Sequence, residues 1–323
     1  MIKKFITLFK IGRKLALSDA LNIISKIYEI PILIKIFFNL LALFGKKNLN
    51  QNTNKKERLC RSIESMGITF IKLGQFLATR PDIIGEKLSD ELQALQDKVP
   101  PFPKDVALNE IREGVGEDNY GEFINISDPI AAASIAQVHT AQIKEKGVLK
   151  EVAIKVLRPN IKKIFNDEIE ALMLLAYIIE SLVKKTKRLK LVEVVFLLKE
   201  ITNHEMDLRF EAAAANEFYE NTINDVGFKI PKIYWKFTSD NVLTLDWIDA
   251  ISIREVDKIK LIGVNIKSLA KDMIQHFLRH AVRDGYFHAD MHQGNLLVDN
   301  SGQLIFIDFG IMGRIDKINR RFL

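Results

Sequence analysis

A short stretch near the C-terminal end, residues 288–308, constrains the fold of this chain most strongly. Asp290 and Asn295 are five positions apart, and Asp308 follows Asn295 by thirteen. Apolar runs follow Asn295 and precede Asp308, and the turn-forming sequence Asp-Asn-Ser-Gly at 299–302 separates them. This order predicts a loop followed by two strands joined by a tight turn. Such a hairpin would bring two carboxylates and one amide to the same rim.

The residue types at this rim suit a magnesium ion. Mg²⁺ is a hard cation that prefers oxygen ligands and leaves positions open for phosphate oxygens. Protein kinases use the same roles at the same spacings: a catalytic-loop Asp, an Asn five residues later, and the Asp of an Asp-Phe-Gly triplet. We therefore predict that Asp290 is the catalytic base or positions the reacting group. Asn295 and Asp308 are the predicted metal ligands.

A lysine inside an apolar run would supply another part of a nucleotide site. Lys155 lies in the apolar stretch 152–157, and a lysine on a buried strand is costly unless it is paired or bound to an anion. In kinases this lysine contacts the α- and β-phosphates and a glutamate holds it in place. We choose Glu211, on a later helical segment, as that partner. Lys155, Glu211 and Asp290 are thus the catalytic candidates.

The segment expected to contact the phosphates departs from the kinase pattern. Kinases place a glycine-rich loop there, because glycine lets the backbone approach the phosphates closely. Here the predicted nucleotide-binding loop contains no glycine and consists of Ala131, Ala132, Ala133, Ser134, Ile135, Ala136 and Gln137. We expect this loop to be stiffer than a kinase loop and to hold nucleotide differently.

Two histidines flank Asp290 and leave another kind of metal site open. His288 and His292 could bind zinc or iron with Asp290, but no third nitrogen or thiolate ligand lies at suitable local spacing. The single cysteine, Cys60, excludes an internal disulfide and a site built on thiolates. We expect His288 to shape the loop instead.

The remaining chain predicts an α+β, protein-kinase-like two-lobed fold with an N-terminal helical extension. Helical and strand periodicities place the elements. The predicted helices are 57–95 (broken near Pro81), 104–115, 161–183, 191–219 and 266–284; the predicted strands are 123–126, 138–143, 152–157, 230–236 and 242–246, with a connector at 247–253. We predict four segments: basic helices and a linker (1–57), a helical extension (58–103), an N-lobe with inserted helices (104–246) and a partial C-lobe (247–323).

Positive charge is concentrated at the N-terminus. Residues 1–60 contain twelve Lys or Arg and three acids, a net +9, whereas the whole chain has +6. Apolar residues recur there at helical spacing, a pattern suited to an anionic membrane surface; packing on its own domain is the alternative. The apolar stretch 31–45 is shorter than the roughly twenty residues that span a bilayer. No nucleic-acid-binding motif is present, so we expect no nucleic-acid partner.

Taken together, these motifs resemble those of the UbiB/aarF-domain family of atypical kinase-like proteins. The N-terminal match is residues 70–75, which contain the family's Lys-x-Gly-Gln element, and the alanine-rich loop and strand lysine follow. Residues 205–207 match its Glu-x-Asp element, and the two C-terminal motifs complete the set. The matches extend from residue 58 to the end of the chain.

The resemblance implies roles that spacing alone does not. In the family, the helix that carries Lys72 and Gln75 folds over the nucleotide cleft, where a kinase would take its protein substrate. Lys72 would meet Glu205 and Asp207 there, so that each charge is paired, and these residues would gate the site. The resemblance also implies ATP and Mg²⁺ as cofactors. It implies ATP hydrolysis or phosphoryl transfer to a small molecule, tied to ubiquinone biosynthesis, and not protein phosphorylation in trans.

Two departures from the family pattern are visible. Gln293 replaces the usual proline of the catalytic loop, which should be tolerated because proline supplies stiffness and not a ligand. The chain also ends thirteen residues after Gly310. We therefore expect an incomplete C-lobe that lacks the C-terminal membrane helices of bacterial members.

Two functions remain open at this point. The first is an ATP-dependent atypical kinase or ATPase that supports quinone-lipid synthesis, peripheral at the cytoplasmic face of a bacterial inner membrane. Its expected partners are anionic or quinone-precursor lipids and other ubiquinone-biosynthesis proteins. The second is a non-catalytic, pseudokinase-like scaffold or lipid-presenting chaperone that binds nucleotide as a structural ligand.

Overall fold

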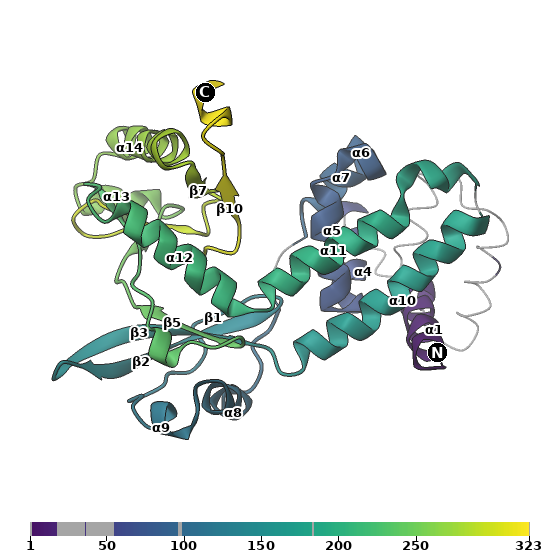
Figure 1. Ribbon diagram of the computed structural model, residues 1–323, viewed down its shortest axis with the longest axis horizontal. Helices are drawn as coiled ribbons and strands as arrows, with labels where there is room; N and C mark the ends of the chain where they lie inside the picture. Colours follow the sequence, from purple (N-terminus) through teal and green to yellow (C-terminus); the bar gives the residue numbers. More distant parts are fainter. Residues whose placement is uncertain (1, 18–35, 37–54, 96–98, 183, 323) are drawn as a thin grey trace. The chain divides into compact units, whose positions relative to one another are not determined.

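The computed structural model describes residues 2–17, 36, 55–95, 99–182 and 184–322, which form two compact units (Figure 1). The first unit comprises residues 1–100, 133–135 and 160–203; the second comprises 101–132, 136–159 and 204–323. The predicted division into four segments stays a prediction. The apolar stretch 31–45 lies outside the described residues, apart from residue 36. No helix in the described ranges is long and apolar enough to cross a membrane.

The first unit is helical. Its elements are α1 (Ile2–Leu17), α4 (Lys55–Met66), α5 (Ile68–Ala78), α6 (Pro81–Ile84), α7 (Glu86–Leu92), α10 (Ile161–Leu182), the 3-10 helix η1 (Lys184–Leu189) and most of α11 (Leu191–Glu205). Leu59, Leu88 and Leu92 form part of a buried core between α4 and α7. The predicted break near Pro81 is confirmed, because Pro81 begins α6. A second break was not predicted: Gly67 (φ 110°) separates α4 from α5.

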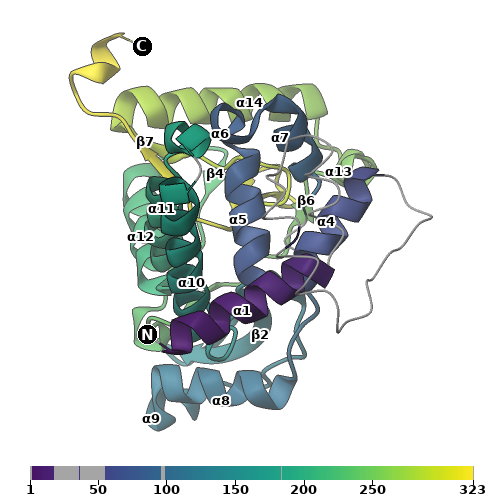
Figure 2. The same cartoon turned by 90° about the vertical axis from the view of Figure 1, so that its right-hand side faces the viewer.

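Helix α1 packs alongside α10 (Figure 2). Ile11 and Ala16 are buried, whereas Ile6 and Phe9 are exposed. The Nζ atom of Lys14 donates a hydrogen bond to the carbonyl of Met66 (2.9 Å). Part of this basic helix therefore packs on its own unit, and two of its apolar side chains remain on the surface.

An antiparallel sheet begins the second unit. Its strands lie in the order β1 (Ala131–Ala132), β2 (Ala136–Glu145), β3 (Val148–Leu157) and β5 (Val242–Asp246). Helix α8 (Lys104–Val115), which is followed by α9 (Glu117–Tyr120), packs against β3 and β5 (Figure 1). Ile111, Val152 and Ile154 belong to the core between helix and sheet. Since side chains alternate along a strand, Lys155 points to the face opposite Ile154.

The second half of this unit combines short strands with helices. A four-stranded sheet has the order β4 (Phe228–Lys229), β9 (Leu304–Phe306), β8 (Leu296–Val298), β6 (Ile251–Ser252), and β7 (Tyr286–His288) pairs with β10 (Met312–Arg314). The helical elements are α12 (Leu208–Thr222), η2 (Trp235–Phe237), α13 (Val256–Leu261), α14 (Ile266–Arg279), its π-helical continuation η3 (His280–Asp284) and η4 (Asn319–Phe322). Phe218 of α12 contacts the rings of Phe228, Phe306 and Phe309, which joins α12 to the sheet.

The structure confirms the predicted α+β class, the hairpin after Asn295 and the helix over 104–115. The predicted strand over 230–236 is wrong: the strand is Phe228–Lys229, and beyond it only Ile233 makes an isolated bridge before η2. Pro231 has no N–H to donate to a ladder and so ends the strand. The predicted strand over 123–126 is also reduced to a single bridge at Ile124. The predicted helix over 191–219 breaks between α11 and α12, and the predicted connector contains β6.

Candidate active site

Strand β3, helix α12 and the segment after β9 bring three charged residues together in the second unit. The Nζ atom of Lys155 binds both carboxylate oxygens of Glu211 at 2.8 Å. The same Nζ lies 3.7 Å from Oδ2 of Asp308. The predicted pair of Lys155 and Glu211 is therefore confirmed, and the predicted metal ligand Asp308 lies beside it.

The charges of this trio stabilise the protonated form of Lys155. Burial opposes the charged form of Lys155, but Asp308 and Glu211 outweigh it and raise the lysine pKa above its ordinary value. Burial raises the pKa of the Glu211 carboxyl, and Lys155 opposes that rise. The ammonium of Lys155 is therefore held in its charged form beside two carboxylates, the form that can bind phosphate oxygens.

The first turn of α12 fixes the position of Glu211. Asp207 is the N-cap of this helix: its Oδ1 accepts a hydrogen bond from the backbone N–H of Arg209 (3.1 Å). The backbone N–H of Leu208 donates to the carbonyl of Asp240 (3.0 Å), which ties the helix start to the loop before β5. Glu211 follows one turn later.

Hydrogen bonds also hold the catalytic loop to the hairpin. Nδ2 of Asn295 donates to the backbone carbonyl of Asp290 (3.2 Å) and to its Oδ2 (3.3 Å). The carbonyl of Asn295 accepts from the N–H of Ile307 (3.2 Å), and Oδ1 of Asp308 accepts from the N–H of Gly310 (3.0 Å). The hairpin therefore brings Asn295 next to the segment that carries Asp308, as its sequence predicts.

His288 links the catalytic-loop residue Asp290 to the segment that carries Asp308. Its ring is buried, Nδ1 accepts a hydrogen bond from the N–H of Asp290 (3.2 Å), and Nε2 donates to the carbonyl of Asp308. Burial lowers its pKa, although Asp308 opposes the shift, so the neutral ring suits both hydrogen bonds. The predicted loop-shaping role of His288 is confirmed. His292 is more exposed, and its Nδ1 accepts from the N–H of Gly294 (2.9 Å).

The oxygen donors at this rim fit a magnesium ion. Because Nδ2 of Asn295 is turned toward Asp290, the amide oxygen is the atom left to bind a metal. Asp290 and Asp308 are partly exposed, at 38% and 45% of their side-chain surface, so a ligand can reach both carboxylates. Carboxylate and amide oxygens are the donors that Mg²⁺ takes in phosphate-binding sites.

The glycine-free segment is only partly a loop. Ala131 and Ala132 form β1 and pair with Val138 and Gln137, so the prediction of one loop over 131–137 is wrong at both ends. The side chain of Gln137 is fully buried. Its Oε1 accepts from the N–H of Phe102 (2.9 Å), and its Nε2 donates to the carbonyl of Phe102 (3.3 Å). Gln137 therefore anchors the strand to the segment before α8.

Comparison with known proteins decides the family. Residues 94–323 match the ABC1 atypical kinase-like domain, which is most of the chain. The chain belongs to this family. "Probable protein kinase UbiB" of Marinobacter nauticus is 37% identical over 302 residues, which are 91% of this chain and 54% of that protein. The protein of the same name from Aeromonas hydrophila is 34% identical over 289 residues, which are 87% of this chain and 52% of that protein.

The chain spans about half the length of these curated UbiB relatives. A solved structure, the complex of Rv3197 with erythromycin from Mycobacterium tuberculosis, is also similar, with 27% sequence identity and a TM-score of 0.49. That similarity covers 75% of this chain and 59% of the other. Membership of the ABC1 family agrees with the kinase-like fold class predicted from the motifs.

Some predicted site residues of this ABC1-family chain stay predictions. The predicted gate would require Lys72 and Gln75 of the first unit to meet Glu205 and Asp207 of the second, and it stays a prediction. The structural roles of Gln137 and of the Asp207 cap were missed. For Asp207 a signal was present, since Asp before a helical run is a common N-cap. No local pattern indicates that Gln137 reaches the backbone of Phe102.

Proposed function

We propose that this ABC1-family chain binds Mg·ATP and acts as an atypical kinase or ATPase that supports ubiquinone biosynthesis. The observation that carries the proposal is Lys155, bound by both oxygens of Glu211 and 3.7 Å from Asp308. This is the arrangement that kinases use to hold phosphates beside the metal-binding aspartate. The names of the UbiB relatives support the link to ubiquinone.

Each residue of the site then has a defined task. Lys155 contacts the α- and β-phosphates, and Glu211 holds its ammonium in place. Asn295 and Asp308 hold the Mg²⁺, which supplies positive charge to the phosphate oxygens when bound. Asp290 orients the attacking hydroxyl or water and accepts its proton, and the hydrogen bonds of His288 fix the distance between Asp290 and the Asp308 segment.

We place this activity at a membrane surface, on the cytoplasmic face and without a spanning helix of its own in the described part. Exposed Ile6 and Phe9 on the basic helix α1 support this placement, because apolar and basic side chains together favour anionic lipid surfaces. Anionic or quinone-precursor lipids and other ubiquinone-biosynthesis proteins are the proposed partners.

Thermal unfolding with and without Mg·ATP tests the proposal. A ligand that binds only the folded state raises the melting temperature as its concentration exceeds its dissociation constant. We expect Mg·ATP to raise the melting temperature of the full chain, and Asp308→Asn to remove most of that increase. Asp257→Asn is the matched control, because its side chain is 97% exposed and lies in α13, outside the site. An unchanged melting temperature at millimolar ATP would overturn the proposal.

A second function is favoured by the turn between β1 and β2. Without glycine, and with Ala131 and Ala132 held in a strand, this segment restricts how closely the backbone can approach phosphates. The chain could then bind nucleotide as a structural ligand and act as a scaffold or lipid-presenting chaperone. ATP turnover that Asp290→Asn abolishes supports the enzyme. Nucleotide binding without turnover, with or without anionic vesicles, supports the scaffold.

A further inference from the structure

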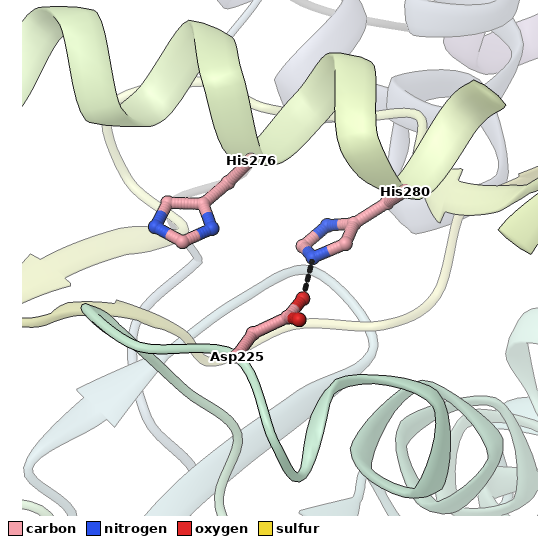
Figure 3. Close-up of side chains that lie close together, drawn as sticks. All are labelled: Asp225, His276 and His280. Atoms are coloured by element: carbon pink, nitrogen blue, oxygen red, sulfur yellow. Dashed lines mark hydrogen bonds and ion pairs between the residues drawn. The ribbon is translucent and has the colours of Figure 1, made fainter. Parts of the chain in front are cut away.

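A second cluster of ionisable side chains lies apart from the lysine site, between α14 and the loop after α12 (Figure 3). His276 and His280 are four residues apart, so a helix places them on one face. Asp225 faces them from the loop that follows α12. All three side chains are largely buried, and one potential ligand atom of each lies within 4.8 Å of the other two.

One nitrogen in this cluster is buried without a hydrogen bond. Nε2 of His280 is 3.0 Å from Oδ2 of Asp225, and Arg283 also binds this carboxylate, with Nη1 2.7 Å from Oδ1. In contrast, Nδ1 of His276 is buried and has no hydrogen-bond partner among the described residues. Figure 3 shows the ring of His276 beside that of His280 and above Asp225. Burying a polar atom unpaired costs free energy, and a bound ligand would remove that cost.

We propose that Asp225, His276 and His280 form a site for a divalent transition metal of the zinc class. Two imidazole nitrogens and a carboxylate oxygen are donors that zinc prefers, at about 2.0–2.1 Å from the metal, which puts tetrahedral ligand atoms about 3.3 Å apart. The separation of His280 and Asp225 is already 3.0 Å. The ligand atom of His276 lies within 4.8 Å of the other two and would have to move closer to reach this spacing.

Zinc binds imidazole in its neutral form. Burial lowers the pKa of His276, with Arg279 adding to the shift, and burial also lowers the pKa of His280, although Asp225 opposes it. His280 must then carry its proton on Nδ1, because Nε2 would offer its lone pair to the metal in place of the hydrogen bond to Asp225.

Arg283 competes with a metal ion for the carboxylate of Asp225. Its guanidinium lies against the Asp225 carboxylate and also binds Asp284 and the carbonyl of Asn221, and 43% of its side chain is exposed. Removing this charge should strengthen metal binding. A purely structural hydrogen-bond cluster would not behave in this way.

Cobalt substitution tests the proposal on the full chain. CoCl2 would be titrated in excess MgCl2, which occupies the oxygen-ligand site of Asn295 and Asp308, while visible absorption is recorded. Four-coordinate Co²⁺ with nitrogen ligands absorbs strongly, whereas Co²⁺ with six oxygen ligands absorbs weakly. We expect one equivalent to give the strong bands, zinc to displace it, and His276→Gln or His280→Gln to weaken binding at least about tenfold.

Two further variants complete the design. His204→Gln is the matched control, because His204 is exposed on α11 and should leave cobalt binding unchanged. Arg283→Gln should tighten cobalt binding by about tenfold, because it removes a positive charge 2.7 Å from the Asp225 carboxylate that would bind the metal. Absence of the strong bands in the wild type, or bands that survive both ligand variants, would overturn the proposal. So would weaker binding in Arg283→Gln.

Discussion

The pair of Lys155 and Glu211 gives the most direct test of the site's energetics. In Lys155→Met the Glu211 carboxylate, with 8% of its side chain exposed, loses its cation. Removing one partner of a buried ion pair costs about 3–5 kcal/mol. The lysine is 19% exposed and Glu211 can take up a proton, so we expect the low end, about 3 kcal/mol at pH 7. Glu211→Gln should cost less, because Asp308 remains 3.7 Å from the ammonium.

The double variant Lys155→Met/Glu211→Gln isolates the coupling. It removes both charges, so that neither member of the pair is left buried without its partner. Its loss in free energy of unfolding should therefore be about 2 kcal/mol smaller than the sum of the losses in the single variants. Urea unfolding followed by tryptophan fluorescence is a suitable assay. Both tryptophans of the chain, Trp235 and Trp247, lie in the second unit, and the signal therefore reports the unit that holds the pair. The reasoning would be refuted if Lys155→Met lowered the free energy of unfolding by less than about 0.5 kcal/mol. It would also be refuted if the loss in the double variant equalled the sum of the losses in the single variants.

The stability loss of Lys155→Met should also depend on pH. Without Lys155, burial and the nearby Asp308 carboxylate hold the folded-state pKa of Glu211 above its ordinary value of 4.5, opposed only by a backbone hydrogen bond from Phe309. A carboxyl whose folded pKa is raised contributes stability below its unfolded pKa and loses it as pH rises through the folded value. The cost of Lys155→Met should therefore be small near pH 4.5 and grow toward pH 7, whereas the double variant should lack this trend. A flat difference between the two variants would contradict the assignment of Glu211 as the stranded charge.

Three shorter predictions concern other positions. Gly285→Ala should destabilise the second unit by about 1–3 kcal/mol in urea unfolding, because φ is 66° and a Cβ would clash with the carbonyl oxygen of Ile315; an unchanged midpoint would contradict this. Gln137→Leu should cost about 1–3 kcal/mol, since it leaves the N–H of Phe102 unpaired; a cost near zero would show that water replaces the amide. Burial and Glu64 raise the pKa of Cys60 to about 11, so iodoacetamide should label it slowly at neutral pH and much faster in urea.

The sequence predicts most of the active site because its motifs are local. The hairpin strands and turn lie within about a dozen residues, and their pattern alone brings Asn295 close to Asp308. The pair of Lys155 and Glu211 is separated by 56 positions, and only the kinase template indicated it. Contacts without such a template were missed: Gln137 reaches Phe102, 35 positions away, and no periodicity reports which backbone group a buried amide meets.

The errors in the fold have local physical causes. A strand was predicted across Pro231, although proline cannot donate to a ladder, and hydrophobic composition masked that break. The segment 131–137 was predicted as a loop by analogy with kinases. Without glycine, its alanines adopt the extended backbone of β1 and the start of β2. In the first case the missing N–H of proline ended a strand, and in the second the absence of glycine favoured extended backbone.

Asp207 shows how one acidic residue can have two tasks, and a substitution pair separates them. As the N-cap of α12 it needs only an oxygen acceptor for the N–H of Arg209, and asparagine supplies one as well as aspartate does. Its ion pair with Arg209 is mostly exposed on the arginine side and contributes little. We therefore expect Asp207→Asn to keep the helix cap, and Asp207→Ala to lose it at a cost of about 1 kcal/mol in the free energy of unfolding.

The gate predicted from the family resemblance requires something more of the same side chain. Pairing with Lys72 needs a negative charge, which Asp207→Asn removes while the helix cap stays intact. If Asp207 gates the site, Asp207→Asn should change the Mg·ATP-induced rise in melting temperature although the helix cap is kept. Lys72→Met should produce the same change. If the rise is unaltered in Asp207→Asn and reduced only in Asp207→Ala, then Asp207 acts on nucleotide binding solely by holding the helix that positions Glu211.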